Sequence, residues 1–234
     1  MLAAIKAELK LVANPEKALI LRRFFKTGKG EYAEGDRFVG GTVPELRRIV
    51  GHYAECPMLD IQKLLSSKIH EERFIGLQLL VSRFQSGDEK MQKRVYEFYM
   101  RSLSSVNNWD LVDSSALQIV GAYLFDKERD VLFTLAKSQN MWKRRIAIIA
   151  TFYFVRKGEF RDTLAIAELL LEDKQDLIHK AVGWMLREVG KRDKLAEVKF
   201  LNAHAYHMPR TMLRYAIERF PESERRAFLS RTQS

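Results

Sequence analysis

Residues 141–157 read MWKRRIAIIATFYFVRK, and this stretch decides the fold. Between Ile146 and Val155 almost every side chain is aliphatic or aromatic, and the charged side chains stand only at the two ends. A helix that is apolar on nearly every side has to be covered on nearly every side, because apolar surface left in water costs free energy. We therefore expect 141–157 to be an inner helix of a helical protein, with its apolar residues buried.

A small residue inside a basic and aliphatic frame recurs along the chain. The frames are Arg73-Phe74-Ile75-Gly76, Arg144-Arg145-Ile146-Ala147, Lys180-Ala181-Val182-Gly183 and Leu213-Arg214-Tyr215-Ala216. Ser115 or Ala116 fills the wider gap between the first two. A period of about 33–40 residues with two helices per period is typical of HEAT-like repeats. The sequence thus predicts an all-α fold, an α-solenoid with a concave basic groove lined by inner helices.

Apolar periodicity predicts helix after helix, and the alternation typical of strands is missing. We expect helices at 3–12, 15–27, 43–54, 58–68, 70–85, 88–103, 108–124, 127–138, 141–157, 161–171, 174–191, 193–203, 209–220 and 222–231. Thr42 to Glu45 forms a capping box. Gly28 to Gly41 is the one extended loop, whose glycines we expect to supply turns, although backbone amides there could approach a phosphate. Glu71-Glu72 is expected to be a solvated helix start.

Composition limits the function classes. The 234 residues, 47% of them hydrophobic, suffice for a substantial core, and without any low-complexity linker we expect one domain over 1–234. A net charge of +10 favours a polyanion partner, nucleic acid first and an anionic membrane surface second, against the alternative of a solvated basic surface. Cys56 stands alone, so no intrachain disulfide can form. With no signal peptide or membrane span expected, we predict a cytoplasmic protein.

Motifs for metal or cofactor chemistry are missing from the sequence. There is no HExxH, no nucleophile elbow and no dinucleotide fingerprint. His204 and His207 could share a helix face, but no third ligand is evident. We therefore expect no metal site and no cofactor.

The segment Asn107-Asn108-Trp109-Asp110-Leu111-Val112-Asp113 places a carboxylate in an apolar setting. Asn108 can cap the following helix, and Asp113 falls within its apolar arc, one turn after Trp109. A carboxylate there has to be paired, hydrogen-bonded or used in chemistry. The structural alternative is a local polar contact or a buried ion pair.

Basic residues border the apolar faces of two predicted inner helices. In 174–191, Lys180, Trp184 and Arg187 lie on one strip, opposite an apolar side. A tryptophan beside cations suits stacking on nucleic acid, and the alternative is simple packing between repeats. In 141–157, Arg145 either points at a phosphate or at Asp113, or reaches out of a buried helix.

Together these segments resemble the DNA alkylation repair glycosylases of the AlkD type, over nearly the whole chain. The anchors are Gly35–Gly40 running into Pro44–Arg47, then Asn108–Asp113, Trp142–Ala147 and Lys180–Glu188. The resemblance implies a HEAT-like solenoid in which Trp109, Asp113 and Trp184 form the catalytic cluster. It also implies DNA-facing basic residues at Arg145 and Arg187, to which we add Lys143, Arg144, Lys180 and Thr42 as expected DNA contacts. The family often has a second tryptophan where Asn108 stands, and other DNA contacts where Thr42 and Phe24 stand.

That resemblance implies hydrolysis of the N-glycosidic bond of N3- or N7-alkylated purines in duplex DNA. Such bases are positively charged, and breaking the bond moves this charge onto the deoxyribose, where Asp113 and the two indoles can stabilise it. Unit charges about 4 Å apart gain roughly 4 kcal/mol at an effective dielectric of 20, about a thousandfold in rate. The expected partner is duplex DNA containing alkylated bases, bound by a monomer. The alternatives are a non-catalytic HEAT-like scaffold that binds DNA or protein, and a glycosylase adapted to bulkier adducts.

Overall fold

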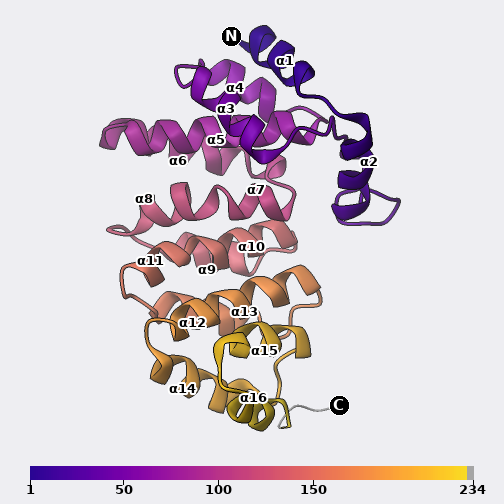
Figure 1. Cartoon of the computed structure of the whole chain (residues 1–234). Coiled ribbons are helices and arrows are strands. Elements are labelled where there is room, and N and C mark those ends of the chain that lie inside the picture. Colours follow the sequence, from indigo (N-terminus) through magenta and orange to yellow (C-terminus); the bar gives the residue numbers. More distant parts are fainter. Residues whose placement is uncertain (231–234) are drawn as a thin grey trace. The chain divides into compact units, whose positions relative to one another are not determined.

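The computed structural model describes residues 1–230 and divides the chain into two compact units, Met1–Ser115 and Ala116–Ser234. Between residues 1 and 230 there is no β-strand, and the one β-bridge joins Arg37 to Ile69. Each unit is a set of short helices joined by turns (Figure 1). The all-α, HEAT-like solenoid class expected from the repeat period is confirmed, while the single domain over 1–234 and the concave basic groove stay predictions.

The first unit, Met1–Ser115, includes the whole of the Trp109 segment. Its elements are α1 (Leu2–Leu11), α2 (Pro15–Phe24), α3 (Val43–His52), α4 (Met58–Leu65), α5 (His70–Ser86), α6 (Glu89–Arg101), the 3-10 turn η1 (Leu103–Ser105) and α7 (Trp109–Asp113). Helix α5 is the centre of this unit and packs against α3, α4 and α6. Ile75, Leu77, Leu79 and Leu80 of α5 are fully buried.

The second unit begins with a π-helical turn. Its elements are η2 (Leu117–Gly121), α8 (Ala122–Leu124), α9 (Asp130–Ala136), α10 (Met141–Ala150), α11 (Phe152–Arg156), α12 (Arg161–Leu169), α13 (Asp176–Gly190), α14 (Lys194–His204), α15 (Arg210–Ala216), the 3-10 turn η3 (Ile217–Arg219) and α16 (Glu222–Leu229). Helix α10 packs against α9 and α13, and α13 packs against α15. From Arg145 to Ala150 every residue of α10 is buried, as expected for the inner helix.

The predicted helices correspond to observed ones, but two of the long spans are interrupted. The span 108–124 breaks at Ser114-Ser115, where the Ser115 hydroxyl bonds the carbonyl of Leu111 at 2.5 Å. The span 141–157 breaks at Thr151, whose hydroxyl bonds the carbonyl of Ile148 at 2.7 Å. Hydroxyl side chains that bond the preceding turn bend helices, and periodicity alone does not report this. The last residue of the span 222–231 lies outside the described residues.

Small residues mark the places where helices cross closely. A Cβ on Gly183 of α13 would lie 2.4 Å from the carbonyl oxygen of Met212, in α15. A Cβ on Gly121, in η2, would lie 2.1 Å from the carbonyl oxygen of Ala150. Gly183 belongs to the repeated frame, whereas Gly121 was not among the small residues expected for its repeat. Close approach of backbones, rather than sequence spacing, selects glycine at this crossing.

The glycine loop and the start of α5 are locked together. Glu71 is 2% exposed and accepts hydrogen bonds from the backbone amides of Val39 and Gly40, at 3.1 and 2.8 Å. Glu72, 3% exposed, pairs with Lys6 at 2.8 Å. The expectation of a solvated Glu71-Glu72 is therefore wrong, since both carboxylates anchor the N-terminal segments. The loop amides of Val39 and Gly40 are occupied by protein, which favours the structural interpretation of these glycines.

Candidate functional site

Helix α7 presents Trp109 and Asp113 one turn apart, both half-buried. Asn108, fully buried, starts the helix because its side-chain oxygen accepts a hydrogen bond from the Trp109 amide at 2.8 Å. This is the capping role expected of Asn108. The arrangement gives one indole and one carboxylate that are accessible in part and that come from a single helical turn.

Rings from three other segments fix the indole of Trp109 in place. Trp109 stacks on Phe25 at 5.3 Å between ring centroids, and Phe25 stacks on Phe38 at 5.1 Å. Phe38 in turn stacks on the imidazole of His70 at 4.6 Å. Phe24, 60% exposed, meets Trp109 edge-on at 5.8 Å. A ring packed in such a column loses its freedom to rotate, so the protein sets the orientation of Trp109 in advance.

The imidazole of His70 at the end of this column lies between two carboxylates. Its Nε2 lies 2.7 Å from Asp110 and its Nδ1 lies 3.3 Å from Asp36. Burial lowers the pKa of His70, but the charge of Asp110 and the hydrogen bonds to Asp110 and Asp36 outweigh it and raise the pKa to about 9. Asp36 is also paired with Arg73 at 2.7 Å. The buried ions are thus compensated, and Asp110 ties the first turn of α7 to α5.

Asp113 lies close to the buried phenol of Tyr99. Burial raises the pKa of Tyr99, a hydrogen bond with Ser115 at 3.0 Å lowers it, and the charge of Asp113 raises it again. Tyr99 is fully buried and stays neutral, so it adds no charge beside the carboxylate.

Trp184 lies half-buried in the second unit, on α13. Its indole N–H donates to Glu188 at 3.3 Å, and its ring meets Phe152 edge-on at 5.7 Å. Glu188 also accepts from Lys191 at 2.9 Å and from Arg192 at 3.1 Å. The expected apolar side of the helix is buried, and Trp184 lies beside it as the strip predicts.

Several of the basic residues expected to contact DNA have partners inside the protein. Arg144 bonds Asp173 at 2.5 Å and two backbone carbonyls, those of Ser138 and Gln139, at 2.8 and 2.9 Å. Arg145 is 5% exposed and donates to the carbonyl of Leu177. These contacts join α10 to the segments around it. The role of both residues in DNA binding stays a prediction.

The remaining expected contacts differ in how they are held. Arg187 pairs with Glu218, and Lys180 pairs with Asp176 at 2.8 Å. The hydroxyl of Thr42 donates to Glu45 at 2.5 Å within the capping box. Lys143 is half-buried with no polar partner among the described residues. Their DNA contacts, too, stay predictions.

The structure brings Trp109 and Asp113 together on α7, and it places Trp184, Arg145 and Arg187 in the second unit. Sequence reasoning missed the trio of Asp36, His70 and Asp110, which joins residues far apart in the chain. The only signal was an isolated histidine at a helix start, which a sequence pattern cannot assign to a partner.

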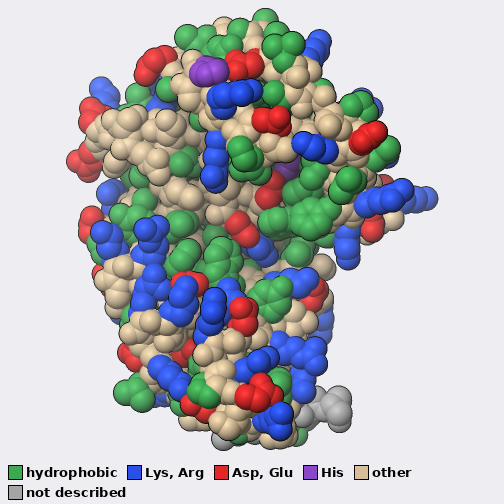
Figure 2. Space-filling model, in the orientation of Figure 1, with side chains coloured by type: hydrophobic (Ala, Val, Ile, Leu, Met, Phe, Trp, Pro, Cys, Tyr) green, Lys and Arg blue, Asp and Glu red, His purple; other side chains and the backbone are tan. Residues whose placement is uncertain are grey.

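Charge on the visible face is mixed rather than of one sign. Figure 2 shows lysine and arginine side chains on both units with carboxylates interspersed. Within residues 1–230, no group of three or more His, Cys, Asp or Glu is arranged to hold a metal ion. In the same part of the chain, no helix has the length and apolar character needed to cross a membrane.

Comparison with known proteins connects this geometry to a family. A search of curated proteins gives no match. Among solved structures, a predicted DNA alkylation repair enzyme from Enterococcus faecalis is similar, with a TM-score of 0.68 and 16% identity, covering 90% of this chain and 97% of that one. At this identity the likeness shows the fold alone. The family described as DNA alkylation repair enzyme matches residues 5–220. The chain therefore belongs to the DNA alkylation repair enzyme family.

Proposed function

We propose that this protein is a monofunctional DNA glycosylase that removes positively charged N3- or N7-alkylated purines from duplex DNA by hydrolysing the N-glycosidic bond. The observation that carries the proposal is the pair on α7: an oriented indole, Trp109, and a half-buried carboxylate, Asp113, one turn apart. Membership of the DNA alkylation repair enzyme family supports alkylated DNA as the substrate.

The chemistry follows from charge. When the bond to a cationic base breaks, positive charge develops on the deoxyribose, and a carboxylate nearby lowers the energy of that state. We assign this role to Asp113, which follows Trp109 by one turn, while Asp110 bonds the buried His70 at 2.7 Å. Asp113 also holds the attacking water in this proposal. A cationic leaving group needs no proton, so no general acid is required.

The indole of Trp109 gives the developing cation a π face, and its stack on Phe25 keeps that face in position. Trp184, fixed by Glu188 and Phe152, has the same role by the family resemblance alone. Lys143, Arg144, Arg145, Lys180, Arg187 and Thr42 are proposed to contact DNA phosphates on the same ground. We propose that the protein acts as a monomer in the cytoplasm.

The test is base release from methylated duplex DNA, measured by chromatography of the freed bases. The unsubstituted protein should release 7-methylguanine and leave uracil in place, since uracil is neutral. Asp113→Asn should lower the release rate by two to three orders of magnitude, from a Coulomb term of roughly 4 kcal/mol. DNA affinity should hold or rise, because a negative charge leaves the binding surface.

Asp126→Asn is the matched control, because Asp126 is exposed and belongs to no described ion pair. It should release bases at the unsubstituted rate. A structural Asp113 would instead give a variant with a lower melting temperature, and with affinity and release lost together. DNA binding without any base release from the unsubstituted protein would favour the non-catalytic scaffold.

A further inference from the structure

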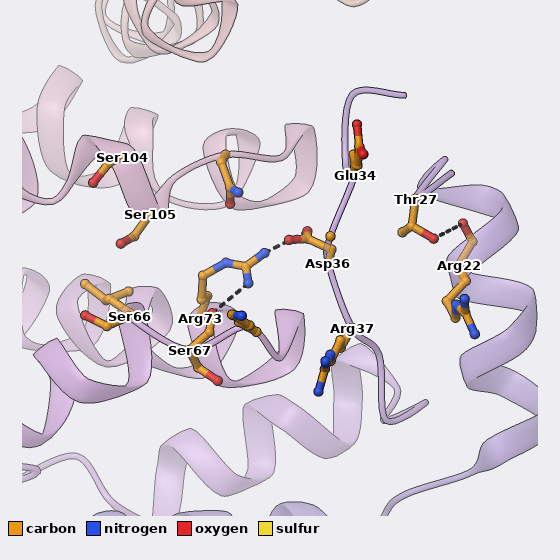
Figure 3. Close-up of a pocket in the computed structure, with 14 residues that line it drawn as sticks. Arg22, Thr27, Glu34, Asp36, Arg37, Ser66, Ser67, Arg73, Ser104 and Ser105 are labelled. Atoms are coloured by element: carbon orange, nitrogen blue, oxygen red, sulfur yellow. Dashed lines mark hydrogen bonds and ion pairs between the residues drawn. The ribbon is translucent and has the colours of Figure 1, made fainter. Parts of the chain in front are cut away.

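A polar cavity of about 600 Å³ lies in the first unit, beside the segment that leads into α7. Four basic side chains line it, Arg22, Arg37, Lys68 and Arg73, against two acidic ones, Glu34 and Asp36. Figure 3 shows Arg73 reaching across to Asp36, with Arg22 and Arg37 on neighbouring segments. The side chains that line the cavity therefore carry a net positive charge.

The two acids of the cavity are already engaged. Asp36 is 8% exposed and bonds both Arg73, at 2.7 Å, and His70, at 3.3 Å. Glu34 accepts a hydrogen bond from the amide of Gly30 at 2.9 Å. By contrast, Arg22, Arg37 and Lys68 are exposed and have no acidic partner among residues 1–230. Three cations of the cavity thus remain available for a ligand.

Backbone hydrogen bonds join the two segments that carry Arg37 and Lys68. The amide of Arg37 donates to the carbonyl of Lys68 at 3.0 Å, and the amide of His70 donates to the carbonyl of Arg37 at 2.8 Å. Backbones joined in this way lie about 5 Å apart. Arg37 is the bridge partner of Ile69, so the side chains of Arg37 and Lys68 leave the paired backbones on opposite faces, and both residues line the cavity. Each cation can therefore attract an anion held within the cavity.

Neutral donors and a buried guanidinium complete the lining. Ser104 and Ser105 carry hydroxyls without a partner among the described residues. The Ser67 hydroxyl oxygen accepts from the amide of Ile69 at 3.0 Å, which leaves its proton to donate. Arg73 is 3% exposed and its buried Nε has no partner. Leu65 is the one large apolar side chain that the described lining contains. Such a lining fits a phosphate and gives a base nothing to stack on.

We propose that this cavity binds a backbone phosphodiester of the duplex DNA, with Arg37 and Lys68 as its cationic pair. The proposal rests on the proposed function, which makes DNA the ligand. The trio of Asp36, His70 and Asp110 connects the cavity wall to the first turn of α7. A phosphate held here would fix the register of the DNA relative to Trp109, without touching the base that leaves.

The test compares Arg37→Ala/Lys68→Ala with the matched double variant Lys93→Ala/Arg94→Ala. Lys93 and Arg94 are exposed on α6, have no described polar partner and do not line the cavity, so both variants lose the same charge from the same unit. Binding to an undamaged duplex is measured by fluorescence anisotropy over a range of salt concentrations. The cavity variant should bind about tenfold more weakly, and its log-log salt slope should fall by about 1. The control should keep the slope of the unsubstituted protein.

A second measurement locates the phosphate. Single methylphosphonate substitutions along the duplex remove one backbone charge at a time. A methylphosphonate at one position should weaken DNA binding by the unsubstituted protein about tenfold and leave DNA binding by the cavity variant unchanged. Equal losses for both proteins at every position would overturn the proposal, and so would equal salt slopes for the two double variants.

Inorganic phosphate separates the sources of the anion. If the cavity served free phosphate, then phosphate at constant ionic strength would raise the melting temperature of the unsubstituted protein and not of the cavity variant, with equal DNA slopes. That result would overturn the DNA assignment. Melting temperatures should agree among all three proteins, because the substituted side chains are exposed. Base release is scored separately, so a protein without glycosylase activity can still confirm or refute the phosphate site.

Discussion

The basic residues of α10 in the second unit and those of the cavity in the first unit look alike in sequence and differ in the structure. Arg144 and Arg145 are tied to a carboxylate and to backbone carbonyls, whereas Arg37 and Lys68 are exposed without acidic partners. The first pair therefore has hydrogen-bond partners within the protein, whereas the second pair has no acidic partner among residues 1–230. A net charge of +10 therefore says that a polyanion is attracted, and the partners of each cation say where it can be held.

The largest expected effect is on stability and comes from removing the Arg144–Asp173 ion pair. Arg144→Ala removes the partner of Asp173, whose side chain is 4% exposed, and leaves a buried carboxylate without its cation. Loss of one member of a buried ion pair costs about 3–5 kcal/mol. Chemical denaturation should show that fall in the free energy of unfolding. Lys143→Ala, one residue earlier and without a described partner, should change it by less than about 0.5 kcal/mol. Equal free energies of unfolding for the two variants would show that the Arg144–Asp173 pair does not stabilise the fold.

A smaller effect concerns the trio beside the cavity. His70→Gln should lower the free energy of unfolding by about 3 kcal/mol at pH 7, because two charge-assisted hydrogen bonds are lost. His52→Gln is the control, since His52 pairs with Glu8 at the surface with 54% of its side chain exposed. It should cost less than about 1 kcal/mol.

The same histidine also gives a pH signature. The pKa of His70 in the folded protein is raised to about 9, above the ordinary value of 6.5. The stabilisation is therefore complete below about pH 6.5 and is lost as the pH rises through 9. The free energy of unfolding of the unsubstituted protein should fall over that interval, and that of His70→Gln should stay flatter. Parallel curves would show that His70 is neutral in the folded protein.

The smallest effect is a gain in stability. Glu197 of α14 is 1% exposed, one of its oxygens has no partner, and burial raises its pKa from the ordinary value of 4.5 to about 8. Between about pH 4.5 and 8 the Glu197 carboxyl is ionised in the unfolded chain and protonated in the folded one. The free energy of unfolding therefore falls as the pH rises through this interval. Glu197→Met should raise the free energy of unfolding by about 1–2 kcal/mol at pH 8 and by less at pH 5. Glu168→Met, at an exposed position, should show no such pH dependence.

The features of the candidate site that depend on residues within one helix were predictable from the sequence. The cap by Asn108, the one-turn spacing of Trp109 and Asp113, and the strip on α13 follow from helix geometry. Partners between distant segments were not predictable. Glu71 was expected in solvent and instead anchors Gly40, and the cavity cations come from three separate segments.

The sequence by itself determined the helical class, the repeat period and the residues that face the core, because apolar spacing and end signals act within one helix. It also supplied the family resemblance that points to alkylated DNA. Only the tertiary structure decided which charged side chains have hydrogen-bond or ion-pair partners within the protein. Arg145 donates to a carbonyl of another helix, whereas Arg37 stays exposed. The difference depends on which groups of other segments lie within about 3 Å, and a local sequence pattern does not contain that information.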